Sequence, residues 1–449
     1  VALALQAVSA SGEAAPAPPA AGRGGRDRRL VMAGAMVAGL ALMAALGVYV
    51  FRTRPGDPRR GGARPPKIVV LPFENLGAPE DAYFAAGMAE EITSRLANVR
   101  GLGVISRTSA MGYDRKGKNV RQVGSDLGVD YVLEGSIRWE RGRGRESRVR
   151  ITPQLIRVAD DTHVWSDRYD RVIADVFAIQ AEVAENAVKA MGVTLLPREQ
   201  GPEEASTGDL EAYDLYLRGQ EATTRGDRRQ DIEESGRMFQ AAVDRDPRFA
   251  RALAGLARSH VRMYWYHFDR SPERLALARE AAERAVALGP ELAETHTALG
   301  EYFYMGLLDF PPALREFRAA LAIQPSSSAA RAGTAFVMRR QGRWAESADA
   351  LSSAVDLDPR NGTMLDNLGL TYIFARRYAD ADRVLGRAVA LSPKWAHPYT
   401  WRAWLQVLWR GDVGAARAIL EEGPDAARSM DDGGTLAGIP LWYSLLPRE

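Results

Sequence analysis

A motif that recurs through the second half of the chain dictates what this half can fold into. Each copy is the end of an apolar helix followed by a proline, as in AVDLDP and AVALSP. The copies end at Pro247, Pro290, Pro325, Pro359 and Pro393. Successive prolines are 43, 35, 34 and 34 residues apart, a period typical of a solenoid of small stacked units. Because apolar residues from Leu210 onward follow helical spacing only, the sequence predicts an all-α solenoid over residues 210–426.

The clearest unit is NGTMLDNLGLTYIFARRYADADRVLGRAVALSP, residues 361–393. Gly369 and Ala381 are expected to let the two antiparallel helices of this unit approach closely. Leu385 is expected to pack in the core of the array, and Pro393 prevents the second helix from continuing. The unit that ends at Pro325 fits the same frame, and the unit that ends at Pro359 fits it less closely.

Positions on the first helix of each unit that avoid this packing frame are expected to line the inner surface of the solenoid. They are Glu294, Thr297, Glu301, Tyr304, Phe336, Arg339, Arg340, Asp366, Leu370 and Phe374. Aromatic and charged side chains mixed in one groove suit the capture of a protein or peptide. The alternative is that these side chains face solvent or pack internally. An aromatic cluster at residues 264–268, in the unit of 43 residues, is either another contact surface or local packing.

An uncharged apolar run of 22 residues, LVMAGAMVAGLALMAALGVYVF, occupies positions 30–51. A bilayer core about 30 Å thick needs about 20 such residues in one helix. The run is too long for the apolar part of a typical signal peptide, so the sequence predicts one transmembrane helix. Residues 1–29 are expected to be a linker and the tail of an upstream domain, and residues 52–66 a second linker.

Basic residues flank this run unevenly. Four arginines precede it, and five arginines and a lysine follow it up to Lys67. Cytoplasmic flanks of transmembrane helices carry the excess of basic residues. The count taken alone therefore favours a cytoplasmic C-terminal side.

Residues 67–193 alternate strand and helix signals. Short apolar runs such as KIVVLPF and LGVIS predict buried strands. Residues 149–157 alternate apolar and polar side chains, and residues 162–169 supply a hairpin partner. The order β-α-β-α-β-β-β-α predicts a small α/β domain with parallel first strands and an antiparallel meander. Residues 194–209 are expected to be a linker and residues 427–449 a C-terminal tail.

Two resemblances together cover residues 67 to about 422. The second half resembles tetratricopeptide-repeat (TPR) proteins by its period and packing frame. The first half resembles the TolB-amino-terminal-like domain, which is found beside TPRs in bacterial membrane signalling proteins. The matching segments are VVLPFENL (69–76), YFAAGMAEEITSRLANVRGLGVISRTSA (83–110), GKNVRQVGSDLGVDYVLEGSIR (117–138) and VRITPQLIRVADDTHVWSDRYDR (149–171).

The resemblance implies an architecture and a context. In such proteins a Ser/Thr protein kinase often precedes the membrane helix, and a class III nucleotide cyclase or a winged-helix domain sometimes does. In the kinase arrangement the TolB-like and TPR parts lie outside the cytoplasm. This contradicts the count of basic residues, and we prefer the family arrangement. The expected location is a single pass through the cytoplasmic membrane, with the C-terminal part periplasmic or extracytoplasmic.

No motif in the sequence supports catalysis. The kinase motifs, the G-x-x-x-x-G-K-[ST] phosphate loop, the G-x-S-x-G elbow and H-E-x-x-H do not occur. The chain has no cysteine, and its five histidines lack metal-ligand spacing. The sequence therefore predicts no catalytic residue, no cofactor and no metal. A net charge of +2 is too small to predict nucleic-acid binding.

Two polar features of the α/β region are candidate sites. The acidic pair Glu90-Glu91 is expected to be solvated, because adjacent residues of a helix point in different directions. Residues 107–109 follow the carboxyl end of a strand, where open sheets often bind ligands. An ordinary strand-to-helix turn is the preferred interpretation there.

These observations predict one transmembrane helix, a small α/β domain and an all-α TPR solenoid. The chain is expected to be a membrane-anchored sensor and interaction segment of a bacterial signalling protein. It would bind protein or peptide partners and regulate an upstream Ser/Thr kinase domain, and would not itself be an enzyme. The alternative is a free-standing, membrane-anchored TPR scaffold with no attached enzyme.

Overall fold

The computed structural model describes residues 64–78, 82–140, 148–172, 176–195, 207–226 and 228–424. From Pro65 onward these residues belong to one compact unit. Among them, no helix is long and apolar enough to cross a membrane. The predicted transmembrane helix at residues 30–51 and the predicted C-terminal tail lie outside the described residues.

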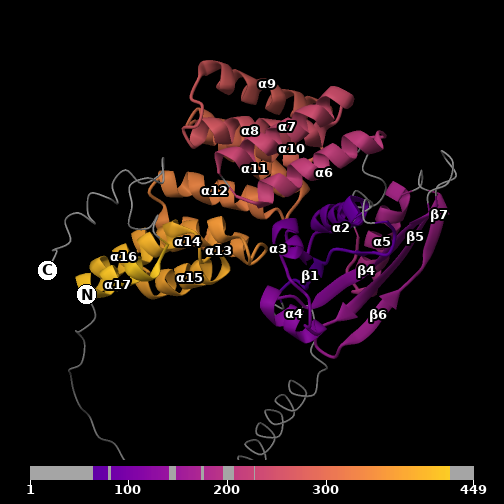
Figure 1. The fold of residues 1–449 in the computed structure, drawn as a ribbon, viewed down its shortest axis with the longest axis horizontal. Helices are drawn as coiled ribbons and strands as arrows, with labels where there is room; N and C mark the ends of the chain where they lie inside the picture. The colour runs from indigo at the N-terminus through magenta and orange to yellow at the C-terminus, as the bar shows by residue number, and fades with distance from the viewer. Residues whose placement is uncertain are drawn as a thin grey trace, which may run out of the picture. The chain divides into compact units, whose positions relative to one another are not determined.

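A mixed sheet forms the first part of this unit (Figure 1). Its strands are β1 (Lys67–Val70), β2 (Glu74–Asn75), β3 (Gly103–Val104), β4 (Tyr131–Glu140), β5 (Arg148–Arg157), β6 (Thr162–Ser166) and β7 (Tyr169–Val172). The strand order is β3-β1-β4-β5-β6, with β1 parallel to both neighbours and β4 antiparallel to β5. The predicted partner at residues 162–169 is split, since β6 and β7 pair separately with β5. The mixed topology matches the prediction.

Helices cover both faces of the sheet. They are α2 (Ala82–Ala97), α3 (Arg107–Met111), α4 (Val120–Leu127) and α5 (Val176–Ala190). Ile68 and Val70 pack with α2 and α5 on one face, whereas Val69 and Leu71 pack with α4 on the other. Burial on both faces explains why β1 is a continuous apolar run rather than an alternating one. The short helix α3 was not predicted.

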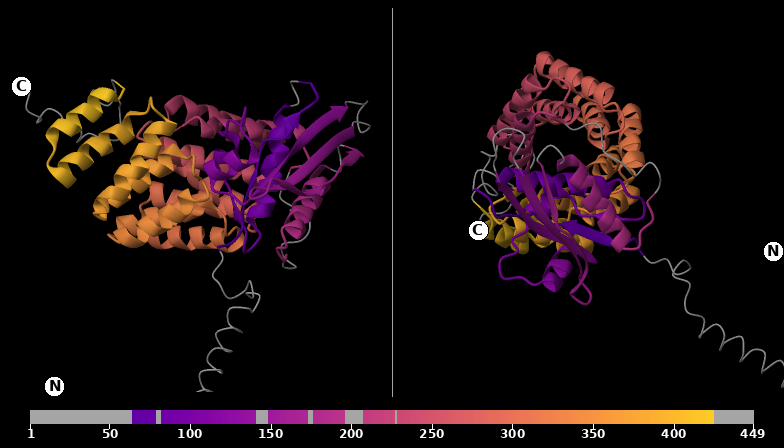
Figure 2. Two further views of the ribbon diagram at one scale, coloured as in Figure 1. Left: turned by 90° about the horizontal axis from the view of Figure 1, so that it is seen from below. Right: turned by 90° about the vertical axis from the view of Figure 1, so that its right-hand side faces the viewer.

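A solenoid of paired antiparallel helices follows the sheet region. Its elements are α6 (Leu210–Thr224), α7 (Arg229–Arg245), α8 (Ala250–Trp265), α9 (Pro272–Leu288), α10 (Ala293–Glu301), the π-helical turn η5 (Tyr302–Gly306), α11 (Phe310–Ile323), α12 (Ser328–Arg340), α13 (Trp344–Val355), α14 (Gly362–Phe374), α15 (Tyr378–Leu391), α16 (Ala396–Arg410) and α17 (Val413–Glu422). Figure 2 shows the pairs following one another along a curved path. The array is a TPR-like solenoid.

The packing frame predicted for the clearest unit is confirmed. A methyl group built on Gly369 would overlap the side chain of Leu385, so only glycine permits this approach of α14 to α15. Ala381 and Leu385 are fully buried in the same cluster. An equivalent contact joins Gly300 to Phe317, where an added Cβ would lie 2.7 Å from a ring carbon. Small residues at these positions set the distance between the two helices of each unit.

Candidate peptide-binding face

Four of the predicted groove residues come together near the ends of α10 and α12. The rings of Tyr304 and Phe336 stack with centroids 6.3 Å apart. The guanidinium of Arg339 lies over the Phe336 ring, 5.2 Å from its centroid. Arg340 Nε donates to the Tyr304 hydroxyl at 3.4 Å. Aromatic rings thus hold two adjacent guanidinium groups in place.

Trp265, the last residue of α8, completes this group. Its ring lies 5.7 Å from that of Tyr304, and the Arg340 guanidinium lies 5.7 Å from its centroid. We call the five residues Trp265, Tyr304, Phe336, Arg339 and Arg340 the arginine–aromatic face. Trp265 belongs to the aromatic cluster at residues 264–268; it packs against Tyr304 and at the same time contributes to this face. The sequence did not link it to the groove because the longer second unit obscures its equivalence with Tyr304.

The charges on this face have neutral partners. Arg339 Nη2 donates to Asn367 Oδ1 at 3.1 Å, and Nη1 lies 3.4 Å from Thr371 Oγ1. Burial lowers the pKa of Arg339, and the neighbouring charge of Arg340 lowers this pKa further. Among the described residues, no carboxylate oxygen lies within 4.0 Å of the Arg339 or Arg340 guanidinium. A carboxylate that approached the face would meet two positive charges without displacing an acidic side chain.

Two other predicted groove residues on α10 have internal partners. The Glu301 carboxylate is buried and accepts two hydrogen bonds from Arg258, at 2.9 and 3.0 Å. Burial alone would raise the pKa of Glu301, but the charges of Arg258 and Arg262 outweigh it and lower this pKa. Thr297 is buried, and its hydroxyl donates to the Ala293 carbonyl at 2.7 Å. Both side chains stabilise the array rather than face a ligand.

The predicted residues of α14 do not belong to the arginine–aromatic face, although the charge of Asp366 acts on Arg339 and partly offsets the lowering of its pKa. Asp366 is buried, and its Oδ2 lies 2.6 Å from His397 Nδ1 on α16. Phe374 is 44% exposed and stacks on Trp344 at 4.8 Å. Leu370, which lies between Asp366 and Phe374 in the sequence, is half-buried. Phe374 and Trp344 border a shallow depression at the turns that follow α12 and α14.

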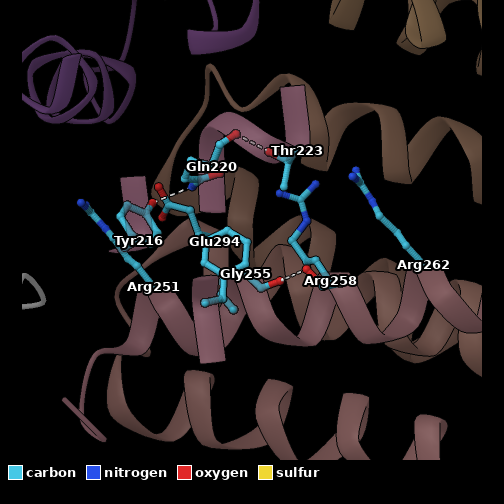
Figure 3. Close-up of a pocket in the computed structure, with 11 residues that line it drawn as sticks. Tyr216, Gln220, Thr223, Arg251, Gly255, Arg258, Arg262 and Glu294 are labelled. Atoms are coloured by element: carbon cyan, nitrogen blue, oxygen red, sulfur yellow. Dashed lines mark hydrogen bonds between the residues drawn. The ribbon is translucent and has the colours of Figure 1, made fainter. Parts of the chain in front are cut away.

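Glu294, the remaining predicted residue, borders a cavity between the first helices of the first units (Figure 3). Tyr216, Arg251, Arg258 and Arg262 also line it. Its volume of about 30 Å³ is enough for about two water molecules. In this structure the cavity therefore has room for water rather than for a bulky side chain.

The prediction that Glu90 and Glu91 are solvated is wrong. Both are buried where α2 meets the helical array. Glu91 forms an ion pair with Arg251 of α8, and Glu90 pairs with Arg107 at 2.9 Å. The Tyr216 hydroxyl also donates to Glu90, at 3.2 Å. The two side chains do point in different directions, but each of them reaches a basic partner, Arg107 for Glu90 and Arg251 for Glu91.

The segment at residues 107–109 also contacts the array. Ser109 Oγ donates to Asp358 Oδ1 at 2.5 Å. The backbone N–H of Ser106 donates to the Leu357 carbonyl at 2.7 Å. The strand-end position considered as a ligand site is thus covered by the turn between α13 and α14, and residues 107–109 form the start of α3 rather than the turn that was preferred.

Comparison with known proteins gives one relative of substantial similarity. No family model matches the chain. A protein of Rhizobium meliloti (strain 1021) named "Putative adenylate cyclase 3" is 37% identical over 224 residues, which cover 49% of this chain. The chain spans only 37% of that protein's length.

Solved structures give weaker likenesses. The Cut9–Hcn1 assembly of the APC/C is 18% identical, with a TM-score of 0.42 over 52% of this chain and 43% of that chain. A TPR protein of Thermus thermophilus is 16% identical, with a TM-score of 0.37 over 44% of this chain and 99% of that chain. The TPR-like character of the array therefore depends on its period and helix packing rather than on these scores.

Proposed function

We propose that this chain is the protein-interaction segment of a membrane signalling protein, and that its array captures an acidic peptide at the arginine–aromatic face. The observation that supports this most directly is the pair of guanidiniums, Arg339 and Arg340, held by aromatic rings without a carboxylate partner. Arg339 is half-buried and Arg340 is exposed, so an anionic ligand could reach both guanidinium groups and form charge-assisted hydrogen bonds with them. A net charge of +2 favours a peptide over a nucleic acid.

The membrane anchor in this proposal is the apolar run at residues 30–51. The sheet region is assigned to the TolB-amino-terminal-like class on its sequence segments, and it is placed with the array outside the cytoplasm. Support for this arrangement comes from the length of the apolar run and from the family resemblance.

The enzyme that this segment would serve belongs to the rest of a longer protein. The sequence resemblance favours a Ser/Thr kinase, whereas the relative from Rhizobium meliloti carries a name that points to a nucleotide cyclase. Because the identity to that relative is 37%, we favour the cyclase as the associated activity. A free-standing scaffold without an enzyme is the second candidate. Expressing the gene's complete reading frame and assaying it for cyclic AMP formation and for phosphate transfer from ATP distinguishes these possibilities.

Peptide capture is tested with a dye-labelled decapeptide that carries two glutamates and a free C-terminal carboxylate. Fluorescence anisotropy with the full chain in detergent should show saturable binding. Replacing Arg339 and Arg340 with Glu should abolish this binding without changing the helical circular dichroism, because like charges then face the ligand.

The matched control changes two exposed arginines on the second helix of a unit. Arg315 and Arg318 lie on α11, and replacing both with Glu should leave peptide binding unchanged. Loss of binding with this outer pair but not with Arg339 and Arg340 would place the peptide on the opposite side of the array and refute the proposal.

A further inference from the structure

The sheet region holds the turn that leads into α14. The Asp358 carboxylate is 2% exposed, and it accepts hydrogen bonds from the hydroxyls of both Ser106 and Ser109. The backbone N–H of Arg360 in turn donates to Ser109 Oγ at 2.9 Å. Asn361, the N-cap of α14, donates to the second Asp358 oxygen at 2.9 Å. Asp358 therefore links the sheet region directly to the start of α14.

A second contact holds the start of α12 in the same way. Ser326 Oγ donates to the Leu102 carbonyl at 2.8 Å. The backbone N–H of Ser326 donates to the Ala97 carbonyl at 3.4 Å. Helix α12 begins two residues later, at Ser328. The sheet region thus contacts the starting turns of two successive first helices.

Helix α12 also carries three residues of the arginine–aromatic face, Phe336, Arg339 and Arg340, near its other end. Arg339 lies at the end of α12, and its guanidinium is held by Asn367 and Thr371 of α14. Helix α12 has 13 residues, so its two ends lie about 20 Å apart. A tilt of about 10° at the start of such a rod moves its end by about 3 Å, as far as the length of a hydrogen bond.

Contacts between the sheet region and the array restrict how the curvature of the array can change. In a solenoid each unit contacts mainly its neighbours, so small rotations between units accumulate into changes of curvature. The sheet region adds contacts to the array that a solenoid alone lacks. It reaches Arg251 in the second unit, Ser326 before α12 and Asp358 before α14. The angle between α12 and α14 is therefore set partly from outside the array.

We propose that Asp358 is a positioning residue for peptide capture: through Ser106 and Ser109 it fixes α14 relative to α12, and so holds Arg339, beside Arg340, in place for the carboxylates of an acidic peptide. This inference rests on the proposed function and adds its regulation. Any event that detaches the sheet region would weaken peptide binding, and peptide binding would favour the docked sheet region by the same factor.

The first test measures binding of the decapeptide described above to the full chain in detergent. Asp358→Ala should weaken binding about tenfold. The pair Ser106→Ala and Ser109→Ala, which leaves the array unaltered, should weaken it as much, and combining all three changes should add little further loss. Asp246→Ala is the matched control. Asp246 precedes Pro247 as Asp358 precedes Pro359, but its carboxylate accepts the N–H of Arg248 in its own turn, so affinity should not change.

The second test needs no peptide. Because the chain has no cysteine, spin labels can be attached at Gln341→Cys and Arg376→Cys, exposed positions just beyond α12 and α14. The distance between the labels should be narrowly distributed in the otherwise wild-type chain and broad after the two serine changes. An unchanged distribution, or full affinity in the serine variant, overturns the role of Asp358. Absence of peptide binding to the wild-type chain refutes peptide capture instead, and the label distances then decide whether Asp358 positions the helices.

Discussion

Arg251 on α8 and Glu91 on α2 form an ion pair between residues 160 positions apart in the chain, and the two side chains are 3% and 0% exposed. Glu91→Gln would leave the Arg251 charge buried with no opposite charge in this pair. Removing one partner of such a pair costs about 3–5 kcal/mol. Urea unfolding of the full chain, followed by circular dichroism, should show a free energy of unfolding lower by this amount.

An exposed pair on the surface of α9 provides the comparison. Arg279 and Glu283 are 62% and 53% exposed and pair at 2.8 Å. Glu283→Gln should change the free energy of unfolding by about 0.5 kcal/mol or less. Equal shifts for the two variants would show that the contact between α2 and α8 contributes no more than a surface pair.

Gly369→Ala tests the close contact between α14 and α15. The added methyl group would overlap Leu385, so we expect a destabilisation of about 1–3 kcal/mol. Gly369→Trp should destabilise the array more than Gly369→Ala does. The control is Gly386→Ala on α15, where an added Cβ meets nothing within 4 Å and should stabilise the helix by about 1 kcal/mol. Thermal melts of the two alanine variants should therefore move in opposite directions, and a shared direction would argue against the overlap.

Gly369→Trp should also destabilise part of the sheet region. The sequence suggests that the α/β part would survive such a change, since repeats couple mainly to their neighbours. Asp358, however, lies in the turn before α14 and bonds to Ser106 and Ser109. We therefore expect hydrogen exchange at α3 to rise together with exchange in the damaged repeat.

His260 predicts a pH-dependent loss of stability. Burial lowers the pKa of His260 from 6.5 to about 4, and the charge of Arg274, whose Nη1 donates to His260 Nδ1 at 2.9 Å, acts in the same direction. Between pH 6.5 and about 4 the unfolded chain binds a proton that the folded chain does not, so the free energy of unfolding falls as the pH falls. The full effect is about 3 kcal/mol.

The measurement compares the wild-type chain with His260→Gln. Glutamine can still accept from Arg274 but does not titrate in this range. The difference between the unfolding free energies of the two proteins should depend on pH through this window and be flat above pH 7. A constant difference at all pH values would contradict the assigned role of burial.

Membrane topology is tested by fusions to the C-terminus of the full chain. With the array outside the cytoplasm, an alkaline phosphatase fusion should be active and a green fluorescent protein fusion dark. The opposite pattern would support the count of basic residues around residues 30–51 and refute the proposed orientation.

The sequence alone determined the repeat and most of the order of strands and helices, but not the short helix α3 or the division of the hairpin partner into β6 and β7. The period of about 34 residues follows from local constraints, because each unit needs a small residue such as Gly369 at its helix contact and a proline to end it. The apolar run of β1 likewise predicted a strand that is buried on both faces. These signals are readable because they depend on residues close together in the chain.

Only the tertiary structure decided which polar residues pair with each other. Glu91 and Arg251, or Asp358 and Ser109, lie 160 and 249 positions apart, and no local pattern links them. The same holds for the predicted groove residues. Glu301 and Asp366 pair with side chains on neighbouring helices. Arg339 and Arg340 instead contact aromatic rings and neutral oxygens. An inward position is set by helical periodicity, but the partner of a charged side chain there is set by the packing angle between helices, which a single sequence does not specify.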